Sequence, residues 1–274
     1  MTTDTKKISR NLKSRHKALL EKYEDEDLHQ LRINIRRARA LLKSQSDKPS
    51  AALREDWGRL AQKTNAARDW DTLAIYAAGV LPSPHWRTLQ PLVEAYRHQA
   101  HEKVLETLRS PGWHTTQSRW NKLVKGSGTK AFAEVTLVGG NRNVAKRALK
   151  AGRRAMTRGD ERGWHKFRIA IKNLRYRLDY SSLKGDRRKD KLKAIKKICK
   201  QLQDELGNWH DTVIHRNLLA QIADDPEVGG DTEVKAALGA LAAAIDVSRT
   251  ESLIYVGSVL ESEWQVLAAA AGET

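Results

Sequence analysis

Hydrophobic positions follow a helical period along almost the whole chain. In residues 28–43 (LHQLRINIRRARALLK), apolar residues recur at steps of three and four, as on the buried face of an α-helix. A histidine and four cations repeat these steps one position later, so a basic stripe runs about 100° round the helix from the apolar one. We expect the apolar stripe to be buried and to hold the cations at the boundary with solvent. The apolar stripe consists of Leu28, Leu31, Ile35, Ala38 and Leu42, and the basic stripe of His29, Arg32, Arg36, Arg39 and Lys43.

The double stripe occurs again in residues 164–180, WHKFRIAIKNLRYRLDY. A single basic helix face is usually solvated surface, because long cationic side chains keep their charges in water. A second copy with the same spacing instead indicates a duplicated unit with a shared use for the cations. The second basic stripe consists of His165, Arg168, Lys172 and Arg175, which match His29, Arg32, Arg36 and Arg39, beside the apolar positions Trp164, Phe167, Ile171, Leu174 and Leu178.

Most other segments also have helical character. Helices are expected at about 8–22, 28–44, 50–80, 85–108 and 112–125, and again at 141–156, 161–182, 189–223 and 231–270. Residues 126–140 hold four glycines and the β-prone AEVTLV, so we interpret them as a connection. We predict an all-α protein of two four-helix bundle halves, 1–125 and 141–274, related by a pseudo-two-fold axis around a basic central groove or pore.

The charge of the chain restricts its partners. Its 274 residues include 50 Lys and Arg against 33 Asp and Glu, a formal net charge of +17. A protein this basic suits a polyanionic partner such as nucleic acid, polyphosphate or an acidic membrane surface. Total charge alone does not choose among them.

The cysteine count and the apolar segments point to a cytoplasmic protein. Cys199 is the only cysteine, which excludes an internal disulfide and a multi-cysteine metal site and fits a reducing compartment. The N-terminal residues have no apolar run typical of a secretory signal. The longest apolar region, 236–260, is interrupted by three charged residues, so we expect no membrane-spanning segment and no membrane partner.

Four segments of the sequence resemble the CHAD family, an α-helical domain named for its histidines. In chain order they are LHQLRINIRRARALL, AARDWDTL, WHKFRIAIKNLRYRLDY and KQLQDELGNWHDTVI. The resemblance implies that residues 1–274 form a single CHAD domain with two helical bundles around a basic cavity. It also implies binding of inorganic polyphosphate and, as in some members, association with polyphosphate granules. The ExExK signature of the triphosphate tunnel domain, often fused to members, is absent, so a stand-alone member is expected.

Two positions depart from the family pattern. Asn65 stands where a glycine is typical, and Asn173 stands where a second arginine often follows Lys172. These departures affect local packing or one phosphate contact rather than the resemblance as a whole.

The stripes suit a long phosphate chain. From His29 to Lys43 the stripe extends for about 21 Å at 1.5 Å per residue, and a rigid row of cations binds a flexible anion with little loss of entropy. The planar fork of arginine takes two phosphate oxygens at once, and Tyr176 adds a hydroxyl donor. For each histidine, the alternative is a buried ring bonded to its neighbours. The predicted polyphosphate-binding residues are His29, Arg32, Arg36, Arg37, Arg39 and Lys43, with His165, Arg168, Lys172, Arg175 and Tyr176.

Other charged residues are weaker candidates. A carboxylate near clustered arginines orients them and offsets their repulsion before a ligand arrives, although a helix cap or ordinary salt bridge is the alternative. We assign this supporting role to the carboxylates Asp69, Asp71 and Asp211, and we place the adjacent Arg68 in the same supporting group. Further cations on helix faces either line the site or are solvated surface; they are Arg10, Lys13, Lys17, Lys146, Arg153, Lys196 and Lys200.

Three other functions compete with polyphosphate binding. Nucleic acid shares the phosphate contacts, but the stripes carry few aromatic side chains on which bases could stack. A metal site or hydrolase could use His29, His165, His210 and His215, yet no known ligand spacing is present, so we predict no catalytic residue, metal or cofactor. An adaptor bundle explains the fold but not the matched stripes. We predict non-catalytic polyphosphate binding, with nucleic-acid binding as the alternative.

Overall fold

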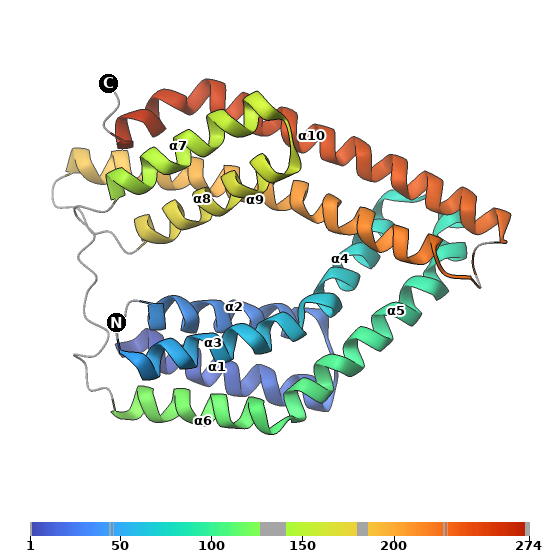
Figure 1. Cartoon of the computed structure of the whole chain (residues 1–274), viewed down its shortest axis with the longest axis horizontal. Helices are drawn as coiled ribbons and strands as arrows, with labels where there is room; N and C mark the ends of the chain where they lie inside the picture. Colours follow the sequence, from blue (N-terminus) through green and yellow to red (C-terminus); the bar gives the residue numbers. More distant parts are fainter. Residues whose placement is uncertain are drawn as a thin grey trace. The chain divides into compact units, whose positions relative to one another are not determined.

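The computed structural model describes residues 2–43, 45, 47–126, 141–179, 186–226, 228 and 230–271. These residues form ten α-helices and contain no β-strand, which confirms the predicted all-α class (Figure 1). The predicted connection 126–140, apart from Gly126, lies outside the described residues, as does the AEVTLV segment. The helices are α1 (Thr2–Glu21), α2 (Asp25–Lys43), α3 (Lys48–Lys63), α4 (Asn65–Val80), α5 (Ser83–Arg109), α6 (Pro111–Gly126), α7 (Asn141–Arg158), α8 (Glu161–Asp179), α9 (Asp186–Ala223) and α10 (Thr232–Ala271).

The chain divides into two compact units. Unit 1 comprises Met1–Glu134 and Ile222–Leu238, and unit 2 comprises Val135–Gln221 and Gly239–Thr274. The sequence assigned residues 222–238 to the C-terminal half, whereas in the structure they group with unit 1. One contact there joins α5 to the turn between α9 and α10, where the Tyr96 hydroxyl donates to Asp225 Oδ2 at 2.9 Å.

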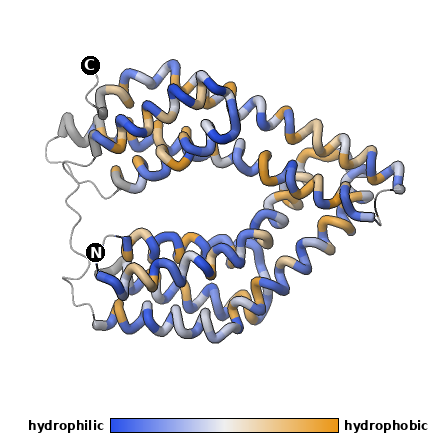
Figure 2. The backbone as a smooth tube through the Cα atoms, viewed as in Figure 1, coloured by the Kyte–Doolittle hydropathy of each residue, from blue (hydrophilic) through white to orange (hydrophobic). Residues whose placement is uncertain are grey.

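The core of unit 1 is built on amphipathic helices that share buried faces. Helix α2 packs against α1 and α3, and α4 packs against α5. All five apolar stripe residues of α2 are 0% exposed, as the spacing predicts. Trp57, Trp113 and Trp120 are also fully buried, with the first two rings edge to face at 5.4 Å, so these tryptophans serve as packing residues. Figure 2 shows the same period along the helices, where hydrophobic positions recur between hydrophilic ones.

The single helix expected over residues 50–80 is two helices, and the prediction was wrong at this point. The break falls at Thr64, whose backbone angles of φ −101° and ψ 3° leave the α-helical region. Its amide donates to Ala61 O at 3.2 Å and its hydroxyl donates to the same oxygen at 2.8 Å. A β-branched residue with a hydroxyl that competes for backbone carbonyls favours such an end to a helix.

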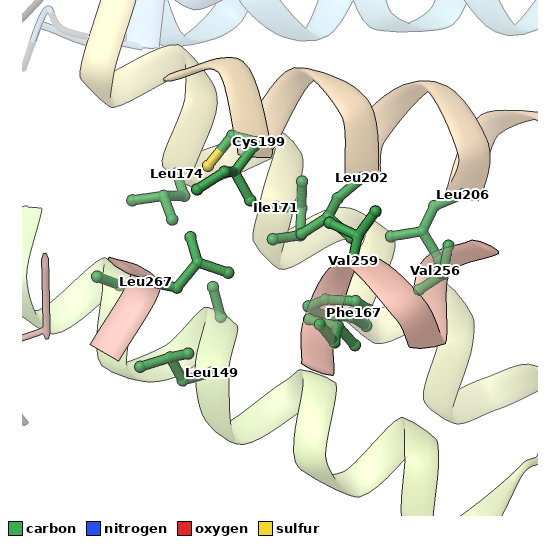
Figure 3. Close-up of a cluster of buried hydrophobic side chains, with 14 of the residues drawn as sticks. Leu149, Phe167, Ile171, Leu174, Cys199, Leu202, Leu206, Val256, Val259 and Leu267 are labelled. Carbon is green, nitrogen blue, oxygen red and sulfur yellow. The ribbon is translucent and has the colours of Figure 1, made fainter. Parts of the chain in front are cut away.

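The core of unit 2 is formed by α7, α8, α9 and α10 (Figure 3). The apolar stripe of α8 is buried among them, which confirms the second prediction made from the spacing. Helix α7 ends at Arg158 and is followed by Gly159, whose φ of 65° suits glycine. Asp160 then caps α8 by accepting from the Gly163 amide at 2.6 Å. The buried residues that Figure 3 labels in this core are Leu149, Phe167, Ile171, Leu174, Cys199, Leu202, Leu206, Val256, Val259 and Leu267.

The α7–α8 turn yields a test of stability. A Cβ at Gly163 would lie 2.8 Å from Asp160 Oδ1 and 3.2 Å from the Cα of Ala155. Because a backbone atom cannot yield cheaply, Gly163→Ala should lower the free energy of unfolding by about 1–3 kcal/mol, measured by urea denaturation. In contrast, Gly239→Ala has open space and should raise it by about 0.5–1 kcal/mol. A gain in stability for Gly163→Ala would show that α7 and α8 are not closely packed there.

Candidate functional site

The basic stripe of α2 lies at the boundary between core and solvent. Arg36, Arg39 and Lys43 are exposed, while His29 and Arg32 are half-buried. Arg37, a predicted binding residue that stands beside the stripe, is exposed as well. The buried apolar stripe on the adjacent face holds these cations in a row without covering the outer ones.

Glycine at position 58 of α3 leaves room for one of these arginines. A Cβ at Gly58 would lie 3.2 Å from Nη2 of Arg39, so the guanidinium rests against the glycine backbone. This contact restricts where the Arg39 charge is placed while its side chain stays exposed. A larger residue on α3 would displace it.

Arg32 is bound to the junction between α3 and α4. Its Nη1 donates to Thr64 Oγ1 at 2.6 Å and to Ala61 O at 3.2 Å, and its Nη2 donates to Asn65 Oδ1 at 2.9 Å. Asn65, which replaces a glycine typical of the resembling family, is therefore a hydrogen-bond acceptor here. Arg32 thus stabilises the break between α3 and α4. Its position in the basic stripe did not predict this structural role.

A cluster of positive charge surrounds the first histidine. Burial lowers the pKa of His29, and the positive charge of Arg68 on α4 lowers it further. Arg36 and Arg32 act in the same direction, whereas Glu26 opposes them. A histidine with a lowered pKa is mostly neutral at pH 7. We name His29, Arg32, Arg36 and Arg68 the N-terminal cluster.

Asp69 supports the N-terminal cluster by its charge. Burial lowers the pKa of Arg32, and Asp69 counteracts this by raising it. The neighbouring charges of Arg36 and Arg68 push the pKa of Arg32 down again. The charge of the carboxylate therefore opposes the effect of the neighbouring arginines on Arg32.

The second stripe has a comparable cluster in unit 2. His165 is exposed on α8, and its ring centroid lies 5.4 Å from that of His210 on α9. Burial lowers the pKa of His210 to about 4, and the positive charges of Arg168, His165 and Lys172 add to this shift. These four residues form the C-terminal cluster. Arg175 is half-buried and Tyr176 is 40% exposed on the same helix.

His210 was missed as a binding candidate, although the sequence held a signal for it. Aligning Asp69 with Asp211 places His210 opposite Arg68. In the structure, each of the two residues lies beside the histidine that begins its stripe: Arg68 lowers the pKa of His29, and the His210 ring centroid lies 5.4 Å from that of His165. The internal repeat therefore extends from the striped helices to the residues beside them.

Asp71 belongs to a buried polar network. It is 0% exposed and accepts hydrogen bonds from Tyr23 Oη at 3.1 Å, Arg97 Nε at 3.2 Å and His101 Nε2 at 2.7 Å. The Tyr23 and His101 rings stack at 3.7 Å. Asp71 follows Asp69 by two residues, about 200° round α4, so the two carboxylates contact different neighbours. The arginine that Asp71 orients is Arg97 on α5.

Ionisation of Asp71 is favoured despite its burial. Burial acts to raise the pKa of this carboxyl, but the hydrogen bonds and charges of His101 and Arg97 outweigh it and lower the pKa. Burial of Tyr23 raises the pKa of its hydroxyl, and the negative charge of Asp71 raises it further. The carboxylate is therefore charged at neutral pH and joins α4 to α5.

Comparison with known proteins identifies the family. The family model described as the CHAD domain matches residues 6–220. The chain belongs to the CHAD domain family. The match includes α2, α4, α8 and His210, and hence both clusters. A search of curated proteins found no match.

A solved structure shares the fold of this CHAD domain. The crystal structure of the CHAD domain from the plant Ricinus communis aligns with a TM-score of 0.65 at 21% identity, over 98% of this chain and 89% of that chain. At this identity the likeness establishes the fold. It agrees with the all-helical architecture described above.

The weaker candidates of this CHAD domain lie mostly on its surface. Lys17 pairs with Glu21 at 3.5 Å, and the Arg153 guanidinium lies 4.9 Å from the centroid of the Trp264 ring, a cation–π contact. Asp211 is exposed and Lys196 is half-buried. The remaining exposed members are Arg10, Lys13, Lys146 and Lys200.

The described part of this CHAD domain has neither a cluster of metal ligands nor a membrane-spanning helix. Among those residues, no three His, Cys, Asp or Glu side chains lie close enough together to hold a metal ion. In the same residues, no helix combines the length and the apolar character needed to cross a bilayer.

The hydrogen bonds of Arg32 predict a stability effect. Arg32→Ala should lower the free energy of unfolding by about 2–3 kcal/mol, because it removes charged bonds to Ala61, Thr64 and Asn65. Arg37→Ala, which removes an exposed cation from the same helix, should change it by less than about 0.5 kcal/mol. Urea denaturation measures both, and equal effects would contradict the structural task of Arg32.

The Asp71 network predicts a pH-dependent effect. Because the folded pKa is lowered, this carboxylate stabilises the fold above its unfolded pKa of about 3.9, and the stability is lost as the pH falls through the folded value. Asp71→Asn should therefore lower the free energy of unfolding by about 3–5 kcal/mol at pH 7 and by much less below pH 3.

The control for this variant is Asp204→Asn, which changes an exposed carboxylate on α9. Denaturation by urea at both pH values compares the two variants with the unchanged protein. A deficit for Asp71→Asn that is the same at both pH values would contradict an ionised Asp71 in the network.

Proposed function

We propose that this CHAD domain binds inorganic polyphosphate through the basic stripes of α2 and α8 without catalysing a reaction on it. The observation that carries the proposal is the duplication of a row of cations beside a buried apolar stripe, once in each unit. Polyphosphate has no bases and no fixed shape, so its recognition depends on repeated charge. A duplicated row of cations matches a ligand made of repeated phosphates.

Burial of the apolar stripe and the position of Arg39 favour a row of cations that is partly ordered before a ligand arrives. In unit 1 the buried side chains fix α2, and the Gly58 backbone limits where Arg39 lies. Ordering a free arginine side chain on binding costs about 0.5–1.5 kcal/mol. Side chains that are already held avoid part of that cost, which favours a tight complex with a flexible anion.

The histidines supply donors that respond to the ligand. His29 and His210 have lowered pKa values in the free protein, chiefly through burial and then through neighbouring positive charge. A bound polyanion neutralises those neighbours and stabilises the protonated rings. Each histidine thus donates a hydrogen bond when neutral and gains charge as phosphate binds.

The chemistry of the clusters supports binding rather than turnover. Cleavage of a phosphate chain needs a positioned nucleophile or an activated water. The N-terminal cluster consists of guanidinium groups and an imidazole, and its nearby carboxylate Asp69 offsets the charge of Arg32. Such groups bind phosphate oxygens.

We further propose that polyphosphate binding recruits the protein to polyphosphate granules.

A titration with labelled long-chain polyphosphate tests the function. We expect submicromolar affinity by fluorescence anisotropy, with a steep loss as salt rises, because cations released from the chain drive binding. The stripe variant Arg36→Gln/Arg39→Gln/Lys43→Gln should bind at least about tenfold more weakly. The surface variant Arg87→Gln/Arg109→Gln/Lys122→Gln also removes two arginines and one lysine, all exposed, and should bind like the unchanged protein.

Three outcomes would contradict the proposal. If both triple variants bind equally, net charge rather than the stripe carries the affinity. If DNA displaces polyphosphate at equal phosphate concentration, the protein is a nucleic-acid binder. Release of phosphate from polyphosphate, with or without Mg²⁺, would contradict the absence of catalysis.

A further inference from the structure

The α7–α8 hairpin contains a basic hollow that the stripes do not use. Its volume is about 470 Å³, within the range of small-molecule sites. Lys166 follows His165 of the stripe by one position, so the hollow lies about 100° round α8 from the stripe. Six cations line it with Ala151 and Gly163; they are Arg147, Lys150, Arg154 and Arg158 of α7, and Arg162 and Lys166 of α8.

Helical spacing and a close turn bring these cations together. The four on α7 follow one another at steps of three, four and four, and the two on α8 are four apart, so each set shares one helix face. The absence of a side chain at Gly163 lets α8 approach the backbone of Ala155 on α7. The two basic faces therefore converge on one hollow.

The acidic residues nearest in sequence are occupied elsewhere. Asp160 caps α8 through the amide of Gly163, and Glu161 accepts from Arg249 Nη2 on α10 at 2.8 Å. In the described part of the chain, none of the six cations forms an ion pair with a carboxylate. Cations spaced by four residues on one helix repel each other, so the hollow holds uncompensated charge.

The internal repeat shows that this charge is peculiar to unit 2. The alignment that pairs His29 with His165 places only one cation of unit 1, Lys22, opposite the six, and Lys22 pairs with Glu24 at 2.5 Å. Duplication of the striped helices therefore does not account for the hollow. The six matched positions in unit 1 are Asn11, Ser14, Ala18, Lys22, Glu26 and Gln30.

We propose that the α7–α8 hollow is a second anion site, which binds a short condensed phosphate of about three phosphoryl groups. A terminal phosphate group carries a charge of about −1.5 to −2 at pH 7 and an inner one about −1, so a chain of three carries about four to five negative charges, which six cations can neutralise. Four of the six are arginines, whose forks bind phosphate oxygens in pairs. The lining has no aromatic side chain on which a base would stack, which favours inorganic phosphate over a nucleic acid.

Isothermal titration calorimetry of the full chain with sodium tripolyphosphate, at about 150 mM salt, tests this site. The hollow variant Arg154→Gln/Arg158→Gln/Lys166→Gln removes two arginines and one lysine, as do the stripe and surface variants. We expect the hollow variant to bind tripolyphosphate at least about tenfold more weakly than the surface variant, with a salt slope smaller by about two. The stripe variant should retain the hollow's tripolyphosphate binding. Circular dichroism and thermal unfolding verify that each variant is folded.

The outcomes separate this site from the proposed function. Equal tripolyphosphate binding by the hollow and surface variants would overturn the second site, even if the stripe variant had lost long-chain polyphosphate. Binding of a single-stranded oligonucleotide at the hollow, with no binding of tripolyphosphate, would overturn it as well. A loss of tripolyphosphate that is confined to the hollow variant supports the site whether or not the stripes bind long chains.

Discussion

Burial of the apolar stripes is the interaction on which each basic stripe depends. Every fully buried leucine or isoleucine of α2 contributes about 1.5–3 kcal/mol relative to exposure. Repulsion between like charges four residues apart on a helix costs only about 0.2–0.5 kcal/mol per pair. Burial therefore outweighs repulsion, and the helix keeps its cations in a row. The same balance applies to α8, whose apolar stripe is buried in the core of unit 2.

Polar contacts then decide which charges stand beside the first stripe. Arg32 binds the Thr64 junction, where α4 begins, and so helps to place Arg68 near His29 and Asp69 near Arg32 itself. On another side of α4, the buried Asp71 is joined to α5 by its hydrogen bonds. Arg32 and Asp71 thus hold helices together, while Arg36, Arg39 and Lys43 of the same stripe remain exposed.

The two units use one pattern with different neighbours. Arg68 of unit 1 and His210 of unit 2 hold matched positions beside the histidines, so one cluster carries a permanent charge where the other carries a titratable one. Unit 2 alone has the basic hairpin, because the matched positions in unit 1 are nearly all uncharged or acidic. The internal repeat therefore covers the stripes, whereas the residues around them differ between the two units.

Residue spacing alone establishes the helical class, the two stripes and their repetition. Helical periodicity is a local property. Residues such as Leu28 and Leu31 share one face of the helix because they are three positions apart in the sequence. Most of the predicted stripe residues indeed lie on the expected side of the helix, with the apolar ones buried and the outer cations exposed.

Packing between helices instead sets the break at Thr64, the partners of Arg32 and Asp71, the contact of His210 with His165 and the convergence of six cations on the α7–α8 hairpin. Each of these depends on which helices lie against each other and at what distance. Asp71 and His101 are thirty residues apart in sequence, yet one hydrogen bond joins them. Such contacts form between helices, and the period within one helix does not encode them.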